Sequence, residues 1–260
     1  MTAPHEQGLA TDLDLILALA ADRRRSLRWL LAGGAASMPL LARGRALAAA
    51  CQPIPAETAG PFPADGSDRA SVPDVLTQSG IVRSDIRASF GAARGRALGI
   101  PLAIELELVN AAGQCAPLAG HAVYLWQCDR DGRYSLYMDS VARENYLRGV
   151  QVADGRGRVA FQSIFPACYL GRMTHVHLEV YPSLAAATGA DRALITTQFT
   201  FPMATMHEAF GAPGYASSQQ NLARTSYADD IAFHDGTALQ IAAMRGNPRD
   251  GYTATLQVAV

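Results

Sequence analysis

Short stretches rich in apolar and β-branched residues recur from about position 102 to the C-terminus, and several of them alternate apolar with polar positions. Alternation with a period of two is typical of a strand that is buried on one face. Turn signals such as Asp154-Gly155 and Pro202 separate these stretches. Many short strands between turns indicate a β-sandwich or a barrel, and we predict an all-β sandwich. The predicted strands cover 102–109, 121–128, 157–165, 174–181, 194–201 and 252–260.

Two parts of the chain lack this pattern. Residues 51–100 are rich in Pro, Gly, Ser and Asp, which predicts a long N-terminal arm with little regular structure. The segment 206–232 is less regular than the strands, and we expect short helices and irregular loops there. The sandwich domain is therefore expected to occupy residues 101–260, with the arm before it.

The first 50 residues have the organisation of a secretion signal. Arg23, Arg24 and Arg25 precede a mildly apolar run over 29–42, and small residues follow at 46–50. The adjacent arginines indicate the twin-arginine export route. The apolar run is too short and too rich in Gly and Ala for a transmembrane helix. We therefore expect an exported protein, periplasmic or extracellular, with no transmembrane segment in the mature chain.

Composition narrows the function further. The chain has 260 residues, 49% of them hydrophobic and 17% charged, which suits one globular core. The formal net charge of -1 gives no general attraction to nucleic acid, so we predict no nucleic-acid partner.

The four cysteines, Cys51, Cys115, Cys128 and Cys168, leave two questions open. An even number in an exported protein permits disulfides, with three pairings open. The residues before Cys51 loosely resemble a lipoprotein cleavage site, so a lipid anchor at Cys51 is a second interpretation.

The most informative stretch runs from Cys168 to His177. His175 and His177 are two residues apart in a predicted strand, so their side chains point to the same face, with Cα atoms about 7 Å apart. Two imidazoles in that arrangement can bind one ion. Tyr134 and Tyr169 are the nearby candidates for the remaining ligands. Two phenolates and two imidazoles form a hard, dianionic set, which favours a trivalent ion such as ferric iron.

These residues lie in motifs that resemble the intradiol ring-cleavage dioxygenases, non-haem ferric enzymes that open catechols between the two hydroxyls. The resemblance covers the chain from about Cys51 to the C-terminus. It is strongest in Leu125-Trp126 through Tyr134-Ser135, Asn145 through Gly149, Gly155 through Val159, and Phe165-Pro166 through Tyr169, Gly171-Arg172 and His175-Val176-His177.

The resemblance implies a role for each residue. Tyr134, Tyr169, His175 and His177 match the Fe(III) ligands, and Tyr169 is the ligand expected to leave when a catechol-type substrate binds. Arg172 matches the arginine that stabilises charge on the substrate ring. Gln198 matches a glutamine of the substrate pocket, and Gly60-Pro61-Phe62 belong to a loop that resembles the border of that pocket. With O2 as co-substrate, the expected product is a muconate-type diacid.

Two departures point to the shorter, exported branch of the family. Only five residues separate Tyr169 from His175, and the N-terminal helical dimerisation domain of the cytoplasmic catechol enzymes is absent. The oligomeric state stays open, with a homodimer as one option.

Two alternatives remain at this stage. One is an exported, non-catalytic β-sandwich that binds a ligand without chemistry. The other is a zinc hydrolase that uses His175, His177 and an acidic residue such as Glu179, which would share their strand face. A red-brown colour from phenolate-to-iron charge transfer distinguishes the dioxygenase from both.

Overall fold

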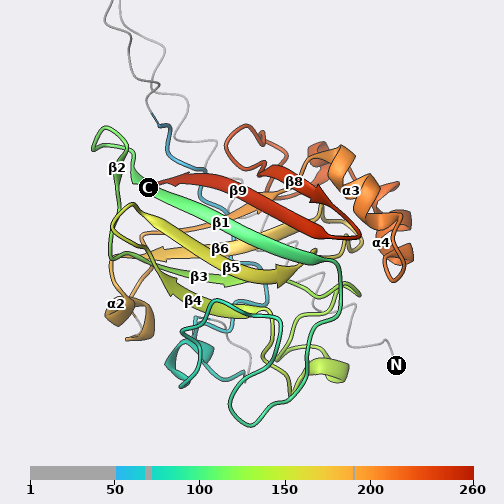
Figure 1. Cartoon of the computed structure of the whole chain (residues 1–260), viewed down its shortest axis with the longest axis horizontal. Coiled ribbons are helices and arrows are strands. Elements are labelled where there is room, and N and C mark those ends of the chain that lie inside the picture. Colours follow the sequence, from blue (N-terminus) through green and yellow to red (C-terminus); the bar gives the residue numbers. More distant parts are fainter. Residues whose placement is uncertain (1–50, 68–71, 190) are drawn as a thin grey trace, which may run out of the picture. The chain divides into compact units, whose positions relative to one another are not determined.

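The computed structural model describes residues 51–67, 72–189 and 191–260, and the predicted secretion signal at 1–50 lies outside them. Two β-sheets form a sandwich, as the sequence predicted, with a few short helices at its edges (Figure 1). The five-stranded sheet has the order β2-β1-β9-β8, with β5 paired to β1, and the four-stranded sheet has the order β4-β3-β6-β7. The strands of the first sheet are β1 (Pro101–Asn110), β2 (Ala116–Pro117), β5 (Arg158–Ile164), β8 (Ala243–Asn247) and β9 (Gly251–Ala259). Those of the second are β3 (Ala122–Trp126), β4 (Arg148–Val152), β6 (His175–Tyr181) and β7 (Ile195–Thr200).

The four-stranded sheet is buried on both faces in its centre. Every residue of β3 and β6 is buried. Val176, Leu178 and Val180 belong to the main core between the sheets, and the alternate residues of β6 point to the other face. That outer face carries a second apolar cluster, which includes Tyr124 and Trp126. The histidines of β6 therefore lie under a cover of loops, outside the sandwich core.

The segment 51–100 provides part of this cover. Among its described residues, 51–67 and 72–100, the one helical element is the 3-10 turn η2 (Val75–Thr77), and other parts follow the sheets through scattered backbone hydrogen bonds. Near its start the Ile54 N–H donates to the Ala259 carbonyl, and the Glu57 N–H donates to the Thr196 carbonyl at the β7 edge. The Thr197 hydroxyl donates to the Pro55 carbonyl over 2.6 Å. These contacts lead the chain along β7 toward the histidines.

A disulfide joins Cys51 to Cys115, which resolves the pairing that the sequence left open. Cys128 and Cys168 are free and buried. A cysteine in a disulfide has no thiol for a lipid, so this disulfide and a lipid anchor at Cys51 are mutually exclusive. The bond ties the first described residue to the turn between β1 and β2.

The six predicted strands are present, but β2, β4 and β8 were missed. β4 and β8 carry Arg and Gly at positions where a predicted strand would have apolar residues. β8 lies at a sheet edge and is mostly exposed, so it pairs by backbone bonds without an apolar face.

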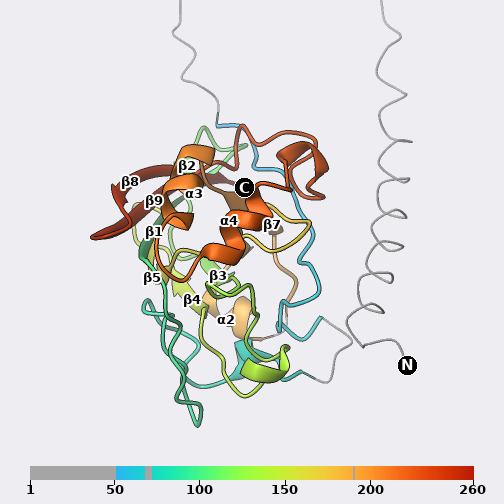
Figure 2. The same cartoon turned by 90° about the vertical axis from the view of Figure 1, so that its right-hand side faces the viewer.

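Most of the short helices follow β6 and β7. They are α2 (Leu184–Thr188) after β6, and α3 (Met203–Phe210), α4 (Ala216–Leu222) and the 3-10 turn η4 (Tyr227–Asp229) after β7. A further 3-10 turn, η3 (Asp139–Val141), lies between β3 and β4. The three helical elements after β7, which are α3, α4 and η4, overlap the segment 206–232 where the sequence predicted short helices. α3 and α4 lie side by side in both views (Figures 1 and 2). No helix among the described residues is long and apolar enough to cross a membrane.

Candidate metal centre

His175 and His177 project from the outer face of β6 with their ring nitrogens together. The two Nε2 atoms are 3.0 Å apart. The Nδ1 of His175 lies 2.6 Å from the Met173 carbonyl, so Nδ1 carries the proton and Nε2 keeps its lone pair. Trp126, which pairs with His177 across β3 and β6, stacks on the His177 ring with centroids 4.8 Å apart. Both rings are therefore held in place by the sheet.

Tyr134 and Tyr169 reach the same point from two loops. The Tyr134 hydroxyl lies 3.2 Å from Nε2 of each histidine and 3.5 Å from the Tyr169 hydroxyl. The Tyr169 hydroxyl lies 3.2 Å from Nε2 of His175. The four side chains that the sequence singled out as ligands thus converge on one point.

Each tyrosine is placed by local structure. Before Tyr134, the Asp129 carboxylate accepts the backbone N–H groups of Asp131 and Arg133, which closes a tight turn through Gly132 at φ +82°. Before Tyr169, the Cys168 N–H donates to the Ser218 hydroxyl of α4 over 3.1 Å. Tyr134 is buried, whereas Tyr169 is half-buried. Tyr169 is therefore the phenol that an incoming molecule could reach.

Burial keeps all four groups neutral in the protein without an ion. It raises the pKa of Tyr169 to about 12 and that of Tyr134 well above its usual value, with the neighbouring phenol adding to the effect at Tyr134. Burial also lowers the pKa of His175 and of His177 well below their usual range, and the Arg172 charge contributes to both. Neutral imidazoles are the form that binds metal.

The residues present fit a metal ion of the ferric type. Ligand atoms that bind one ion at about 2.1 Å lie roughly 3.0–3.4 Å from each other, and five of the six pairs among the four donor atoms lie 3.0–3.5 Å apart. An ion at the centre would lower the pKa of both phenols and turn them into phenolates. Two hard anionic oxygens then favour a trivalent cation over zinc or copper.

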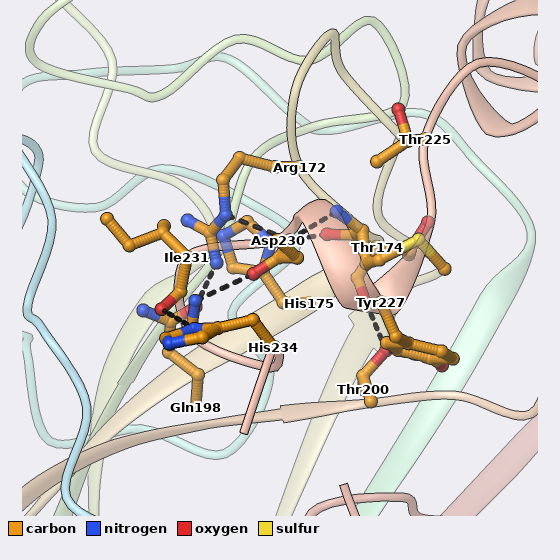
Figure 3. A network of polar contacts seen from close by, with 12 residues as sticks. Arg172, Thr174, His175, Gln198, Thr200, Thr225, Tyr227, Asp230, Ile231 and His234 are labelled. Carbon is orange, nitrogen blue, oxygen red and sulfur yellow. Dashed lines mark hydrogen bonds and ion pairs between the residues drawn. The ribbon is translucent and has the colours of Figure 1, made fainter. Parts of the chain in front are cut away.

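Arg172 stands beside the cluster, held by two partners that Figure 3 shows around it. Its Nε donates to the buried Asp230 carboxylate over 3.0 Å, and its Nη2 donates to Oε1 of Gln198 over 2.5 Å (Figure 3). Nε2 of Gln198 donates to the Thr58 carbonyl of the arm over 2.8 Å. Gln198 is fully buried, with both ends of its amide bonded inside the protein. Its predicted contact with substrate stays a prediction.

Two of the three residues of the loop Gly60-Pro61-Phe62 contact the tyrosine–histidine cluster. A Cβ at Gly60 would contact Cε1 of His177 at 3.4 Å, and the φ of +69° at Gly60 disfavours any residue with a side chain. The Phe62 ring stacks on Tyr134 with centroids 4.8 Å apart. Pro61 is exposed. Gly60 and Phe62 therefore contact the predicted ligands, and Pro61 faces outward.

Sequence reasoning missed two residues of the site. Asp230 lies 58 residues after Arg172, in a segment without a motif, so no local pattern marked it. Arg148 lies in a stretch quoted for the family resemblance, but its partner Ser135, which follows Tyr134, is distant in the chain. A buried charged residue that bonds to a loop elsewhere in the chain, as Asp230 and Arg148 do, is not marked by any periodic pattern in the sequence.

Glu179 does not join the histidines. Its carboxylate accepts the Tyr181 hydroxyl over 2.7 Å and the Thr196 hydroxyl over 3.1 Å. Burial, with a contribution from Asp65, raises its pKa to about 7. The described part of the chain contains no group of three or more His, Cys, Asp and Glu side chains that could hold a metal. The zinc-hydrolase interpretation therefore lacks its third ligand.

Comparison with known proteins decides the family. The family model described as Dioxygenase matches residues 82–222, more than half of the chain. The chain belongs to the intradiol ring-cleavage dioxygenase family. Members of this family use ferric iron, and the tyrosine–histidine cluster lies in the matched region. No curated protein matches the chain in a sequence search.

Solved structures share the intradiol dioxygenase fold. An intradiol ring-cleavage dioxygenase from Tetranychus urticae is 24% identical, with a TM-score of 0.62 over 80% of this chain and 94% of its own. A second dioxygenase crystal structure is 26% identical, with a TM-score of 0.56 over 70% of this chain and 87% of its own. The dioxygenase domain of a carbohydrate-binding fusion from Streptomyces sp. SirexAA-E is 20% identical, with a TM-score of 0.49 over 80% and 98% of the two chains.

Proposed function

We propose that this protein is an active ferric intradiol dioxygenase, which opens a catechol-type ring between its two hydroxyls with O2 and yields a muconate-type diacid. The observation that carries the proposal is the convergence of two phenol oxygens and two imidazole nitrogens, five of whose six pairs lie 3.0–3.5 Å apart. Membership of the family supports it independently.

Tyr134, Tyr169, His175 and His177 would hold the ion. When bound, ferric iron supplies a Lewis acid and a template for the catechol and O2. The difference in burial separates the roles of the two phenols. Tyr134 is enclosed between Phe62 and the histidines and stays in place, whereas the half-buried Tyr169 can move and accept a catechol proton on its Oη. Tyr169 accepts that proton as a phenolate and then keeps it, because burial raises the pKa of its phenol to about 12 without an ion.

Arg172 supplies the fixed positive charge of the site. Its side chain is largely buried, and its guanidinium is oriented by Asp230 and Gln198. A guanidinium held in a partly dry site stabilises negative charge that develops on a bound ring. The apolar surroundings of Trp126 and Phe62 exclude water from the histidine side of the cluster.

The direct test of this proposal is turnover. Iron-loaded protein is mixed with catechol, protocatechuate and hydroxyquinol, and oxygen uptake is followed together with product analysis by mass spectrometry. We expect one O2 consumed per ring and a diacid that carries both oxygen atoms from O2. Tyr169→Phe should abolish turnover, and the exposed Arg143→Gln serves as the control that retains it. A product cleaved outside the two hydroxyls, or no turnover of any catechol, contradicts the proposal.

We also propose that the protein works outside the cytoplasm. The disulfide between Cys51 and Cys115 supports this, since such bonds persist in oxidising compartments. Fractionation of the producing cells, with N-terminal sequencing of the purified chain, tests it. A cytoplasmic protein that retains Met1 would contradict export.

A further inference from the structure

Asp230 is a fully buried carboxylate beside the candidate metal centre, and it contributes no ligand to it. Its Oδ2 accepts the Arg172 Nε–H over 3.0 Å and the Met173 backbone N–H over 2.6 Å. Its Oδ1 accepts the Ala232 backbone N–H over 2.8 Å. One carboxylate oxygen therefore fixes both the guanidinium and the backbone of the residue that follows Arg172, which leads into the histidine strand.

The segment that carries Asp230 is itself anchored to the sheet. Tyr227 in η4 donates its hydroxyl proton to the Phe201 carbonyl over 2.6 Å, and its hydroxyl lies 3.1 Å from that of Thr200 in β7. Figure 3 shows Tyr227 and Thr200 in the same network as Asp230 and Arg172. The position of the carboxylate is thus set by β7, the strand that also supplies Gln198.

Arg172 depends on these anchors for its direction. A long arginine side chain has many rotamers, and ordering it costs conformational entropy. Asp230 holds Nε and Gln198 holds Nη2, so the plane of the guanidinium is defined by two contacts. Within the described part of the chain, Nη1 has no hydrogen-bond partner, which leaves this donor available to a bound molecule.

We infer that Asp230 is a positioning residue for the ring-opening reaction, which acts by holding the Arg172 guanidinium in the direction that stabilises charge on the substrate. The inference rests on the proposed function. An asparagine at this position keeps the size of the side chain but replaces one carboxylate oxygen with an NH2 group. That group cannot accept, so the ion pair is lost together with at least one contact: the Ala232 contact if NH2 replaces Oδ1, or the Arg172 and Met173 contacts if it replaces Oδ2.

The test is a double-mutant cycle on kcat. Asp230→Asn should lower kcat by about 10- to 100-fold, as expected when a catalytic charge is misplaced, with KM changed by less than about threefold because ground-state binding to the metal centre is kept. The matched control is Asp229→Asn, an adjacent exposed carboxylate whose partner is Ser226. We expect the control to keep the kcat of the unmodified protein. The iron content and the visible absorption of both variants should equal those of the unmodified protein.

The same substitution is then made in the Arg172→Met background. If Asp230 acts through Arg172, Asp230→Asn causes no further loss of kcat in the Arg172→Met background. An equal fold-loss of kcat in both backgrounds, or a changed charge-transfer band in Asp230→Asn, would show a general structural role and overturn the inference.

A second measurement needs no substitution at Asp230 and no metal. In 15N-labelled metal-free protein, the Arg172 Nε–H should give a slowly exchanging NMR signal, assigned by its loss in Arg172→Lys. A fast-exchanging Arg172 signal overturns the inference even if Asp230→Asn does not fold. If the unmodified protein turns over no catechol, the proposed function fails, and the catalytic meaning of the pair fails with it. If it is active and Asp230→Asn matches Asp229→Asn, only the positioning inference fails.

Discussion

Arg148 provides the clearest stability prediction. It lies in β4 with 1% of its surface exposed. Its guanidinium donates to the Ser135 hydroxyl over 3.2 Å, to the Ser135 carbonyl over 3.0 Å, to the Pro63 carbonyl over 2.9 Å and to the Tyr124 hydroxyl over 3.0 Å. One side chain therefore joins the arm to the loop that carries Tyr134. Arg148→Met keeps an unbranched stem and removes all four bonds.

The expected loss of stability follows from these contacts. Hydrogen bonds from a charged donor contribute about 1.5–3 kcal/mol each. The Pro63 carbonyl still accepts the Tyr124 hydroxyl at 2.7 Å, whereas the Ser135 carbonyl loses its Arg148 partner. Removal of the buried cation also relieves its desolvation cost, which offsets part of the loss. A buried polar group left without its partner costs about 1–3 kcal/mol, and the Ser135 hydroxyl and carbonyl both lose Arg148, so we expect a net loss of about 3 kcal/mol for Arg148→Met.

The assay is urea unfolding followed by tryptophan fluorescence. Trp126 is buried against the His177 ring, so its emission reports on the site as the protein unfolds. A loss of about 3 kcal/mol should lower the urea midpoint by about 1 M, at a slope of about 3 kcal/mol per M. The exposed Arg143→Met is the control and should stay within about 0.5 kcal/mol of the unmodified protein.

Arg148→Met within about 1 kcal/mol of Arg143→Met would refute this reasoning. It would show that the hydrogen bonds of Arg148 only balance the cost of burying its charge. A loss of stability with an unchanged site would be informative too, since Arg148 is expected to hold Ser135 and thereby Tyr134. We therefore expect weaker ferric-ion binding in the same variant.

Three further predictions concern the cysteines and pH. In the folded protein at about pH 8, Cys128 and Cys168 should not react with iodoacetamide, because burial raises the pKa of Cys168 to about 11 and that of Cys128 further. Two thiols should react after unfolding, and four after unfolding and reduction. Reaction of four thiols in unfolded protein without a reductant would exclude the disulfide. Cys51→Ser should lower the free energy of unfolding by about 4 kcal/mol, since the bond closes a loop of 64 residues; an unchanged urea midpoint would contradict this. The apparent affinity for Fe3+, measured against a competing chelator, should rise from about pH 6 to pH 8, because both phenols must lose protons whose pKa values lie above the usual range; a flat profile would mean that phenolates are not ligands.

The sequence predicted the parts of this protein that repeat a local pattern. The strand at His175–Tyr181 was found because β-branched and apolar residues alternate with the histidines, and the structure explains the alternation by two different buried faces. The sandwich followed from several such stretches. β8 was missed because an exposed edge strand needs no apolar face, and its Arg245 and Gly246 resemble a turn.

The predicted ligands lie together because two of them share a strand and the other two lie in motifs of the family. The contacts that orient them were beyond sequence reasoning. Asp230 reaches Arg172 only through the path of the chain after β7, and Arg148 reaches Ser135 only through the packing of β4 against a loop. Such pairs form only when the folded chain brings the two residues together. No local pattern at these positions in the sequence indicates that contact.

The central claim is that Tyr134, Tyr169, His175 and His177 bind one ferric ion, and its most direct measurement is a visible-light titration of metal-free protein with Fe3+. We expect a broad red-brown phenolate-to-iron absorption band that saturates at one ion per chain. The band should be strongly diminished in Tyr134→Phe and retained in Tyr137→Phe, whose hydroxyl lies 2.7 Å from the Ala64 nitrogen and outside the cluster. A colourless protein at saturation, or a band that Tyr134→Phe leaves unchanged, would contradict the account.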